Sequence, residues 1–515
     1  MPEKKSFYIT TTIPYVNADP HIGFALELVQ SDAIARYQRI LGKEVFFSTG
    51  TDEHGQKIWE ASEKEGRNVQ DYVDSYAQKF IDLKKLLNLS NDNFIRTTNP
   101  AHIRAAQEFW QLCDAKGDIY KKKYKGLYCV GCEKFMTEKD VVDGKCPIHP
   151  TKIPETVEEE NYFFKLTNYR AQLLEYLSKE KSIIPEWRRQ EAIEFVKNEM
   201  EDFSVSRSKE RFSWGVAIPG DDTQVMYVWF DAFVNYISTL GWPFGYAQGK
   251  PDSHHPALKG TPPPAEGEEN TPHPSPLLKK GEGESLFQKF WVNGEHIQTA
   301  GKDMVKFQSV MWQGMLMSAG LPTTDTVIYH GFITGEGGIK MSKSIGNVIG
   351  PSEIVKEYGT DALRYFLLRE ISSFEDSPFT MERFKDAYNA NLANGLGNLV
   401  SRILTMAESY GVKLGNLEGP AIPVKQWLEV FDVKRAMDEI WWHINDIDKF
   451  IAEKKPFSLY KTEPDKAKSD ILVTLQRLQG IALAIEPFLP ETSKKIKKLI
   501  LDNKKPEKPL FLRKG

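Results

Sequence analysis

The first fifty residues restrict the fold of this chain more than any other stretch of its sequence. Phe7–Thr11 is a short β-rich run that ends in a loop containing Pro14 and Pro20. Apolar residues then recur at helical spacing over Ile22–Ile40, and Val45–Ser48 is a second β-rich run. A strand, a helix and another strand in this order predict a parallel sheet with helices on its faces. Such sheets bind nucleotides at the carboxyl ends of their strands, where a helix N-terminus presents free N–H groups.

Composition and periodicity divide the 515 residues into five predicted segments. Residues 1–117 and 223–325 supply the two halves of a Rossmann-like domain, and residues 118–222 are a cysteine-bearing connective domain inserted between them. Residues 326–383 form a linking region, and residues 384–515 form a separate α-helical bundle. The fold class is therefore α/β with a helical C-terminal domain.

Three local predictions refine this division. Residues 243–284 are dense in Pro, Gly, Glu and Lys, and they are predicted to be disordered because they contain too few large apolar side chains to offset the entropy of ordering. Lys57–Leu89 is predicted to be helical. After the low-complexity stretch, a strand is predicted to resume near Phe290.

Bulk properties exclude several classes of protein. A net charge of −4 argues against a general nucleic-acid binder, although a local basic patch can suffice for one RNA partner. No apolar stretch reaches the roughly 20 residues that a membrane span needs. The N-terminus has no apolar run followed by a small-residue cleavage site. Four cysteines are too few for a disulfide framework at this length, so a reduced, cytoplasmic location is expected.

Three of the four cysteines gather in the insertion. Cys129-x-x-Cys132 and Cys146-x-x-His149 are two ligand pairs separated by a turn-rich spacer, which is the pattern of a tetrahedral structural zinc site. Four protein ligands leave no open coordination position. One zinc ion is therefore expected to organise this segment as a zinc knuckle rather than to catalyse, and Cys113 is expected to be a buried structural residue.

Two short motifs lie at the ends of predicted strands. PHIGF (Pro20–Phe24) occupies the turn into the first helix, where His21 can donate to a phosphate oxygen and Gly23 permits close backbone approach. KMSKS begins at Lys340 after a strand and a Gly-rich turn, and Lys340 and Lys343 can neutralise a departing pyrophosphate. Either motif alone could be an ordinary loop, but their order within α/β segments favours one shared nucleotide site.

The two motifs resemble the signature pair of class I aminoacyl-tRNA synthetases, and the blocks around them resemble the methionyl-tRNA synthetase family. These blocks are IPYVNADPHIG, FFSTGTDEHGQKI, YVWFDAFVNYI, AGKDMVKFQSVMWQGMLMSAGLP, HGFITGEGGIKMSKSIGNVI and NANLANGLGNLVSRIL. The resemblance covers the chain apart from the low-complexity stretch and the far C-terminus. It implies that ATP, with Mg²⁺, activates methionine as methionyl-adenylate for transfer to tRNA(Met). It also implies that the helical bundle binds the anticodon. We expect a cytoplasmic monomer.

The resemblance also implies a role for each matching residue. Catalysis falls to His21, Lys340 and Lys343, and ATP binding to Gly23, Phe24, Gly301, Asp303 and Lys343. Asp52 would hold the methionine ammonium group, and the rest of the methionine site would comprise Ile13, Tyr15, Trp229, Ala232, Tyr236, Gln308 and Trp312. The anticodon would be read by Asn398, Arg402 and Phe457. Without the resemblance, the aromatic residues would be interpreted as core and the anticodon residues as ordinary surface positions.

Three positions depart from the family's pattern. Phe24 stands where the second histidine of the HxGH motif is expected, and phenylalanine cannot donate a hydrogen bond to ATP. Loss of one transition-state donor can cost roughly 10²–10³ in rate. Gln308 occupies a pocket position that is often histidine, and Phe457 occupies one that is commonly a base-stacking tryptophan.

Two other functions stay open at this point. A class I synthetase for another amino acid would share both motifs, and a difference of one methylene is worth only about 1–3 kcal/mol in selectivity. A non-catalytic tRNA-binding paralogue would account for Phe24, although KMSKS, Asp52 and the AGKD segment are all retained.

Overall fold

The computed structural model describes most of the chain. The described residues are 5–129, 134–136, 141–147, 153–211, 213–243, 284–338, 349–415 and 419–515. The KMSKS motif and all but the two ends of the stretch 243–284 therefore lie outside the described residues, as do Cys132 and His149.

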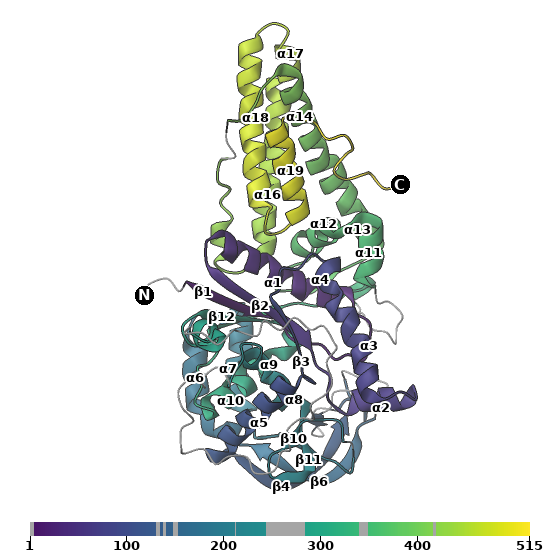
Figure 1. Ribbon diagram of the computed structural model, residues 1–515, viewed down its shortest axis with the longest axis vertical. Helices are drawn as coiled ribbons and strands as arrows, with labels where there is room; N and C mark the ends of the chain where they lie inside the picture. The colour runs from purple at the N-terminus through teal and green to yellow at the C-terminus, as the bar shows by residue number, and fades with distance from the viewer. Residues whose placement is uncertain are drawn as a thin grey trace, which may run out of the picture.

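A six-stranded parallel sheet confirms the predicted α/β class (Figure 1). In spatial order its strands are β3 (Asn93–Arg96), β2 (Glu44–Thr51), β1 (Ser6–Thr10), β12 (Glu295–Gly301), β13 (Thr326–His330) and β7 (Ile183–Ile184). The strand order reverses at β1, which pairs with β2 on one side and with β12 on the other. Open α/β sheets bind ligands outside the carboxyl ends of the strands at such a reversal.

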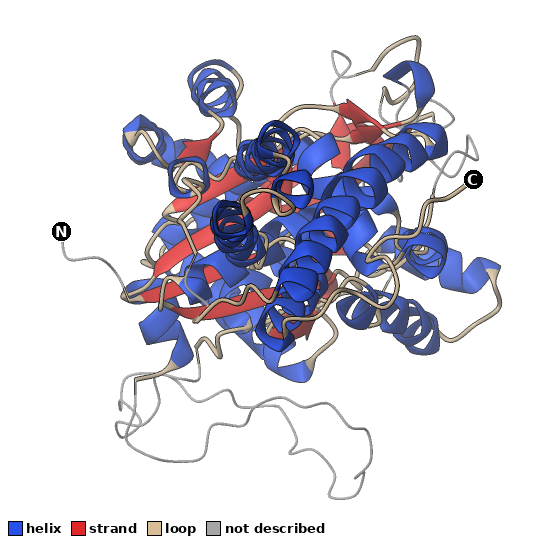
Figure 2. Cartoon of the chain, turned by 90° about the horizontal axis from the view of Figure 1, so that it is seen from above, coloured by secondary structure: helices blue, strands red, loops and turns tan. Residues whose placement is uncertain are grey.

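Alternate residues along the strands pack into two hydrophobic cores. Phe7 and Ile9 of β1 join the core that contains helix α1 (Ile22–Ile40), whereas Tyr8 between them joins the second core with helix α5 (Pro100–Ala115). Helices flank the strands on both sides when the molecule is seen from above (Figure 2). Both faces of the sheet are thus buried, as is usual for parallel strands.

Helix α1 has the predicted bounds, but the predictions for Lys57–Leu89 and for the region near Phe290 are wrong in detail. Lys57–Leu89 is interrupted because Gly66 adopts a left-handed conformation (φ 64°) and the Asn68 side chain caps a new helix. The resulting helices are α2 (Gln56–Lys64), α3 (Val69–Ile81) and α4 (Leu83–Leu86). The region around Phe290 is a helical turn, η4 (Gln288–Val292), and the strand begins only at Glu295.

Residues between α5 and β12 form smaller sheets and helices. One antiparallel sheet has the order β5 (Lys134–Met136), β4 (Ile119–Cys129), β6 (Glu155–Phe164) and β8 (Phe203–Ser204), and another has β10 (Ala217–Ile218), β11 (Asp221–Met226) and β9 (Ser206–Ser208). The helices here are η2 (Leu166–Tyr169), α6 (Arg170–Ser178), α7 (Glu186–Asn198), α8 (Val228–Phe233) and α9 (Asn235–Ser238). After β12 come η5 (Lys302–Met304), η6 (Phe307–Met311) and α10 (Trp312–Ser318).

The C-terminal region is helical, as predicted, and stands above the sheet in Figure 1. The linking part contains β14 (Ile333–Thr334), η7 (Glu336–Gly338), α11 (Pro351–Tyr358), α12 (Thr360–Tyr365), η9 (Phe366–Glu370) and β15 (Ser377–Pro378). The bundle contains α13 (Met381–Ala387), η10 (Tyr388–Gly397), α14 (Asn398–Tyr410), α15 (Lys425–Leu428), α16 (Val433–Lys454), α17 (Pro456–Leu459), α18 (Pro464–Ala484) and α19 (Pro490–Asp502).

A buried arginine joins the bundle to the sheet region. Arg364 of α12 pairs with Asp32 of α1 at 2.7 Å, and both side chains are fully buried. Its Nε donates to the carbonyl of Phe488, between α18 and α19, at 2.7 Å. The Arg364 guanidinium thus links α1 to the loop between α18 and α19. The orientation of the bundle relative to the sheet therefore depends on an ion pair that is shielded from solvent.

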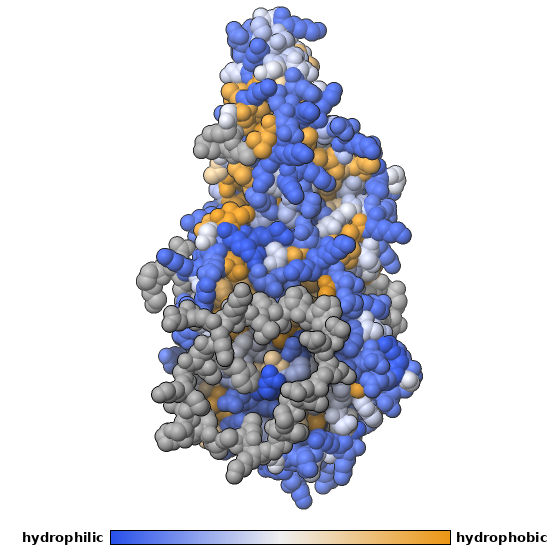
Figure 3. Space-filling view, in the orientation of Figure 1, coloured by the Kyte–Doolittle hydropathy of each residue, from blue (hydrophilic) through white to orange (hydrophobic). Residues whose placement is uncertain are grey.

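The face shown in Figure 3 is largely hydrophilic, with apolar patches along the helical bundle. No helix within the described ranges is both long and apolar enough to cross a membrane.

Candidate functional site

A cavity of about 350 Å³ opens at the carboxyl ends of the central strands. Its walls come from the segments that follow β1, β2, β12 and β13, together with the N-terminus of α1 and helices α8 and α9. Most of the predicted methionine and ATP residues line it: Ile13, Tyr15, His21, Gly23, Phe24, Asp52, Trp229, Ala232, Tyr236, Gly301 and Asp303. A wider opening of about 1010 Å³ between α3, α4 and α11 is lined by none of the predicted residues.

His21 directly precedes α1 and is its N-cap. Its Nδ1 accepts a hydrogen bond from the backbone N–H of Gly23 at 3.1 Å. Because Nδ1 accepts, the proton of the neutral imidazole lies on Nε2, so that atom is a donor. A Cβ on Gly23 would approach the His21 ring to 3.0 Å, which explains the glycine at this position. Phe24 is half-buried against Phe80 of α3, with ring centroids 5.5 Å apart.

Asp52 follows β2 and is 6% exposed. Its N–H donates to the carbonyl of Pro14 at 2.9 Å, and its carbonyl accepts from Val16 at 3.3 Å. These two bonds fix the backbone of Asp52 against the loop that carries Tyr15. The carboxylate is therefore held in a nearly dry wall of the cavity, where its interaction with a cation is strong.

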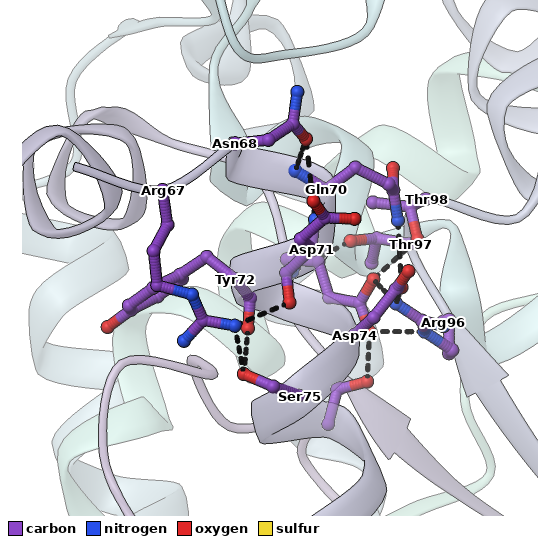
Figure 4. A network of polar contacts seen from close by, with 12 residues as sticks. Arg67, Asn68, Gln70, Asp71, Tyr72, Asp74, Ser75, Arg96, Thr97 and Thr98 are labelled. Carbon is purple, nitrogen blue, oxygen red and sulfur yellow. Dashed lines mark hydrogen bonds and ion pairs between the residues drawn. The ribbon is translucent and has the colours of Figure 1, made fainter. Parts of the chain in front are cut away.

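Neighbouring residues anchor the segment that carries Asp52. Glu53 is fully buried and accepts two hydrogen bonds from Arg96, at 2.7 and 2.9 Å. Arg96 also contacts Asp74 of α3 (Figure 4). His54 lies 2.7 Å from the Asp231 carboxylate on α8, and burial raises the pKa of Asp231 even though His54 opposes the rise. The Asp52 segment is thus tied on one side to α3 and on the other to the helix that carries Trp229.

Aromatic side chains form another wall of the cavity. Trp229 stacks on Phe307 with ring centroids 4.2 Å apart. Tyr236 is 2% exposed, and burial raises the pKa of its hydroxyl well above the ordinary value, so it stays neutral. An apolar, polarizable wall of this kind suits a thioether side chain.

Two of the predicted methionine residues do not line the cavity. Trp312 is fully buried behind Tyr236, with ring centroids 5.8 Å apart, and it also stacks on Phe109 and Phe233. Gln308 is fully buried, and neither polar atom of its side chain has a hydrogen-bond partner among the described residues. Trp312 therefore supports the aromatic wall from behind.

Gly301 and Asp303 lie together at the end of β12. A Cβ on Gly301 would approach the Asp303 carboxylate to 2.9 Å, so a larger residue would displace that side chain. The Asp303 side chain is exposed toward the cavity. An exposed carboxylate beside a glycine suits the hydroxyl groups of a ribose.

The sequence reasoning missed two charged residues of this cavity, Glu27 and His330. Glu27 lies three residues after Phe24 on the same face of α1. His330 is the last residue of β13, at the edge where the carboxyl ends of the strands meet. The spacing along α1 and the HGF segment after a predicted strand were the signals that could have identified them.

The predicted anticodon residues lie in the bundle, away from the cavity. Asn398 and Arg402 share a face of α14, and Phe457 on α17 is 53% exposed. Arg402 pairs with Asp448 of α16 at 2.7 Å. This ion pair orients the guanidinium but leaves more than a third of the side chain exposed.

Of the predicted zinc ligands, only Cys129 and Cys146 are described. Both are buried, and they pack in one small cluster. Within the described ranges, no group of three or more His, Cys, Asp or Glu residues is arranged to hold a metal. Cys113 lies elsewhere and is fully buried, as predicted, and burial raises the pKa of its thiol to about 12.

Comparison with known proteins agrees with the architecture and the cavity. The profile of a family described as tRNA synthetases class I (M) matches residues 7–153, 149–262 and 271–404. With a parallel sheet and a HIG turn at its strand reversal, these matches define a class I tRNA synthetase.

Individual relatives show which family within this class the chain belongs to. The methionine–tRNA ligase of Caldanaerobacter subterraneus is 39% identical over 513 residues, covering 96% of this chain and 73% of that protein. The Nostoc enzyme of the same name is 37% identical and covers 96% and 89%. The structure of Mycobacterium tuberculosis methionyl-tRNA synthetase in complex with methionyl-adenylate superposes with a TM-score of 0.82 at 33% identity, covering 96% and 94%. The chain belongs to the methionine–tRNA ligase family.

Proposed function

We propose that this protein activates methionine with ATP and transfers it to tRNA(Met). The observation that carries the proposal is the single cavity in which most of the predicted methionine and ATP residues meet. Its volume of about 350 Å³ lies in the range of small-molecule sites. The relatives that share nearly the whole chain are methionine–tRNA ligases, which favours methionine over another amino acid.

In the first step, the methionine carboxylate attacks the α-phosphorus of ATP. A carboxylate oxygen–phosphorus bond forms, the bond between the α- and β-phosphates breaks, and pyrophosphate leaves. Asp52 would bind the ammonium group and thereby aim the carboxylate at the phosphorus. His21 would donate from Nε2 to the phosphate as charge develops, beside the positive end of α1. Mg²⁺ bound with ATP would neutralise charge on the phosphates.

In the second step, a ribose hydroxyl at the tRNA 3′ end attacks the activated carbonyl and AMP leaves. No protein nucleophile is required. Asn398, Arg402 and Phe457 would select the tRNA at the far end of the molecule, because an amide, a guanidinium and an exposed ring can bind unstacked bases. Lys340 and Lys343 keep their proposed role at the pyrophosphate. Participation in translation would place the enzyme in the cytoplasm.

We also propose a structural zinc ion in the insertion. Val142 and Lys145 exchange two backbone hydrogen bonds, at 3.0 and 2.9 Å, around a tight turn at Asp143 and Gly144. This turn leads directly into Cys146, which packs with Cys129. The two described thiols are soft ligands that suit zinc, and Cys132 and His149 would complete the set. Metal analysis should find one zinc per chain, and C129S should lose it, whereas C113S should retain it.

Charging of tRNA(Met) with labelled methionine tests the proposed function. We expect ATP-dependent formation of methionyl-tRNA with an unmodified transcript. A transcript with a substituted anticodon should be charged far more slowly. Binding of tRNA without any charging would support a non-catalytic paralogue and contradict the proposal.

A further inference from the structure

A carboxylate outside the cavity connects two segments of its wall. Asp376 lies in the loop 371–376, between η9 and β15, and it is not among the residues that line the cavity. Its Oδ1 accepts a hydrogen bond from the backbone N–H of Phe332 at 2.9 Å, and its Oδ2 pairs with Lys302 Nζ at 2.7 Å. Phe332 follows β13 and Lys302 follows β12, so Asp376 bridges the ends of two neighbouring strands.

These two strand ends form the part of the cavity that suits a nucleoside. Lys302 lies between Gly301 and Asp303, the two lining residues that suit a ribose. The Phe332 ring, which also lines the cavity, comes within 3.6 Å of the position that a Cβ would take on Gly301. The Lys302 ammonium group lies over this ring, 4.8 Å from its centroid. Asp376 therefore contacts both residues that flank the proposed ribose position.

The backbone around Asp376 packs tightly on the segment after β13. A Cβ on Gly331 would approach the backbone carbonyl carbon of Glu375 to 2.1 Å, so only glycine fits there. The N–H of Ser377 donates to the carbonyl of Phe332 at 3.0 Å, next to the pairing of β14 with β15. Contacts on both sides of Asp376 thus hold it beside Phe332.

The other end of this loop is anchored to the bundle. Ser373 Oγ donates to Asp432 Oδ1 at 2.9 Å and accepts from the backbone N–H of Lys434 at 3.0 Å. Asp432 is the N-cap of α16, and Lys434 lies in the first turn of that helix. The loop therefore has a fixed base on a long helix, from which Asp376 can hold the strand ends in place.

The Asp376 carboxylate is ionised. Partial burial raises its pKa, but Lys302, the N–H of Phe332 and Arg188 together lower the pKa below its ordinary value. The side chain is 40% exposed, and water screens an exposed ion pair. Loss of the carboxylate should therefore displace the strand ends rather than unfold the protein.

We propose that Asp376 is a positioning residue for the nucleoside part of ATP: by holding Phe332 and Lys302, it fixes the ends of β13 and β12 at the spacing that the nucleoside requires. The inference rests on the proposed use of ATP at this cavity. Asp376 acts through these two residues, because it does not line the cavity itself. Methionine would bind at Asp52 and the aromatic wall, so its affinity should not depend on Asp376.

Equilibrium binding of ATP, adenosine and methionine, each alone, to the full chain tests this inference. D376A is expected to weaken ATP and adenosine binding by the same factor, about 10-fold, because both contacts are lost. Methionine binding should change by less than about twofold. D376N should have a smaller effect, because an amide oxygen can still accept from Phe332. K302M should resemble D376N, and the double variant should bind no more weakly than the weaker single one.

Asp92 offers a matched control. It also accepts from the backbone N–H of a phenylalanine, Phe47, at 2.8 Å and pairs with a cation, Arg39, at 2.7 Å. Its side chain is likewise 40% exposed, but it lies at the amino end of β3 and does not line the cavity. D92A and D92N should leave the binding of all three ligands unchanged.

Several outcomes would overturn the inference. Equal weakening of adenosine and methionine binding by D376A would show a general structural role, and unchanged adenosine binding in both D376A and D376N would show none. Weaker ATP binding with unchanged adenosine binding would place the effect at the phosphates instead. Adenosine binding that depends on Asp376 in a protein that activates no amino acid would refute the proposed function and leave the inference intact. A wild-type protein that binds neither ATP nor adenosine would refute both.

Discussion

At the carboxyl ends of the sheet, most of the predicted residues come from segments up to about three hundred positions apart and meet in one cavity. At the bundle, the predicted residues lie on α14 and α17, and Phe457 is largely exposed. The first arrangement presents buried side chains such as Asp52 and Tyr236 to a small molecule, and the second presents an exposed surface to a large one. Charges in the cavity should therefore have large energetic effects, and contacts at the bundle should have small ones.

The largest effect should follow from D52N. Loss of the carboxylate would leave the methionine ammonium group buried without its counter-charge, which costs about 3–5 kcal/mol, or roughly 10²- to 10⁴-fold in kcat/KM for methionine. Steady-state kinetics at varied methionine should show this loss with little change in KM for ATP. D446N is the control: Asp446 pairs with Arg477 in the bundle at 2.9 Å and does not line the cavity. An unchanged methionine KM in D52N would remove Asp52 from the proposed site.

A comparable effect on stability should follow from R364M at the junction of the two regions. Asp32 would keep its partly exposed partner Arg36 but lose its fully buried one, and three buried backbone carbonyls would lose the donor that Arg364 supplies. The free energy of unfolding should therefore fall by about 3–5 kcal/mol. R402M, which breaks the more exposed Arg402–Asp448 pair, should cost less than about 1 kcal/mol. Urea unfolding of both variants measures the contrast. Equal losses would contradict the distinction between buried and exposed charges.

The same junction should respond to acid. Burial alone would raise the pKa of Asp32, but Arg364 and Arg36 lower it below its ordinary value. A depressed pKa contributes stability above the unfolded pKa, and this contribution is lost as the pH falls through the folded value. The difference in unfolding free energy between wild type and D32N should therefore shrink below pH 4. A difference that stays constant down to the acid transition would show that Asp32 is not ionised in the folded protein.

The smallest effect should follow from F457A. Stacking of one base on an aromatic ring is worth about 1–3 kcal/mol, so kcat/KM for tRNA(Met) should fall roughly 5- to 150-fold. Activation of methionine without tRNA should be unchanged, because the cavity lies in the other region. W442A removes another exposed aromatic residue of the bundle, on α16, and serves as the control.

The two regions also differ in what the sequence could predict. Helix α1 was predicted with the observed bounds because apolar residues recur at helical spacing from Ile22 to Ile40, directly after the break at Pro20. Asn398 and Arg402 share a helix, so local spacing alone places them on one face. The break at Gly66 and the helical turn at Phe290 were missed, because a left-handed glycine and tertiary packing override local propensity there.

The residues that line the cavity could not be predicted from local sequence patterns alone. Without the resemblance, Trp229 and Tyr236 could not be separated from core aromatics, since contacts across the sheet decide which ring faces a cavity. Gln308 and Trp312 illustrate the reverse case, because both are fully buried but neither lines the cavity. The Glu27–His330 pair spans 303 positions and emerges only once α1 packs over β13.

The account depends above all on activation of methionine in the cavity. Exchange of labelled pyrophosphate into ATP, measured with each of the twenty amino acids in turn, tests this directly and needs no tRNA. We predict rapid exchange with methionine and little with any other. Exchange that depends on a different amino acid, or none with all twenty, would contradict it.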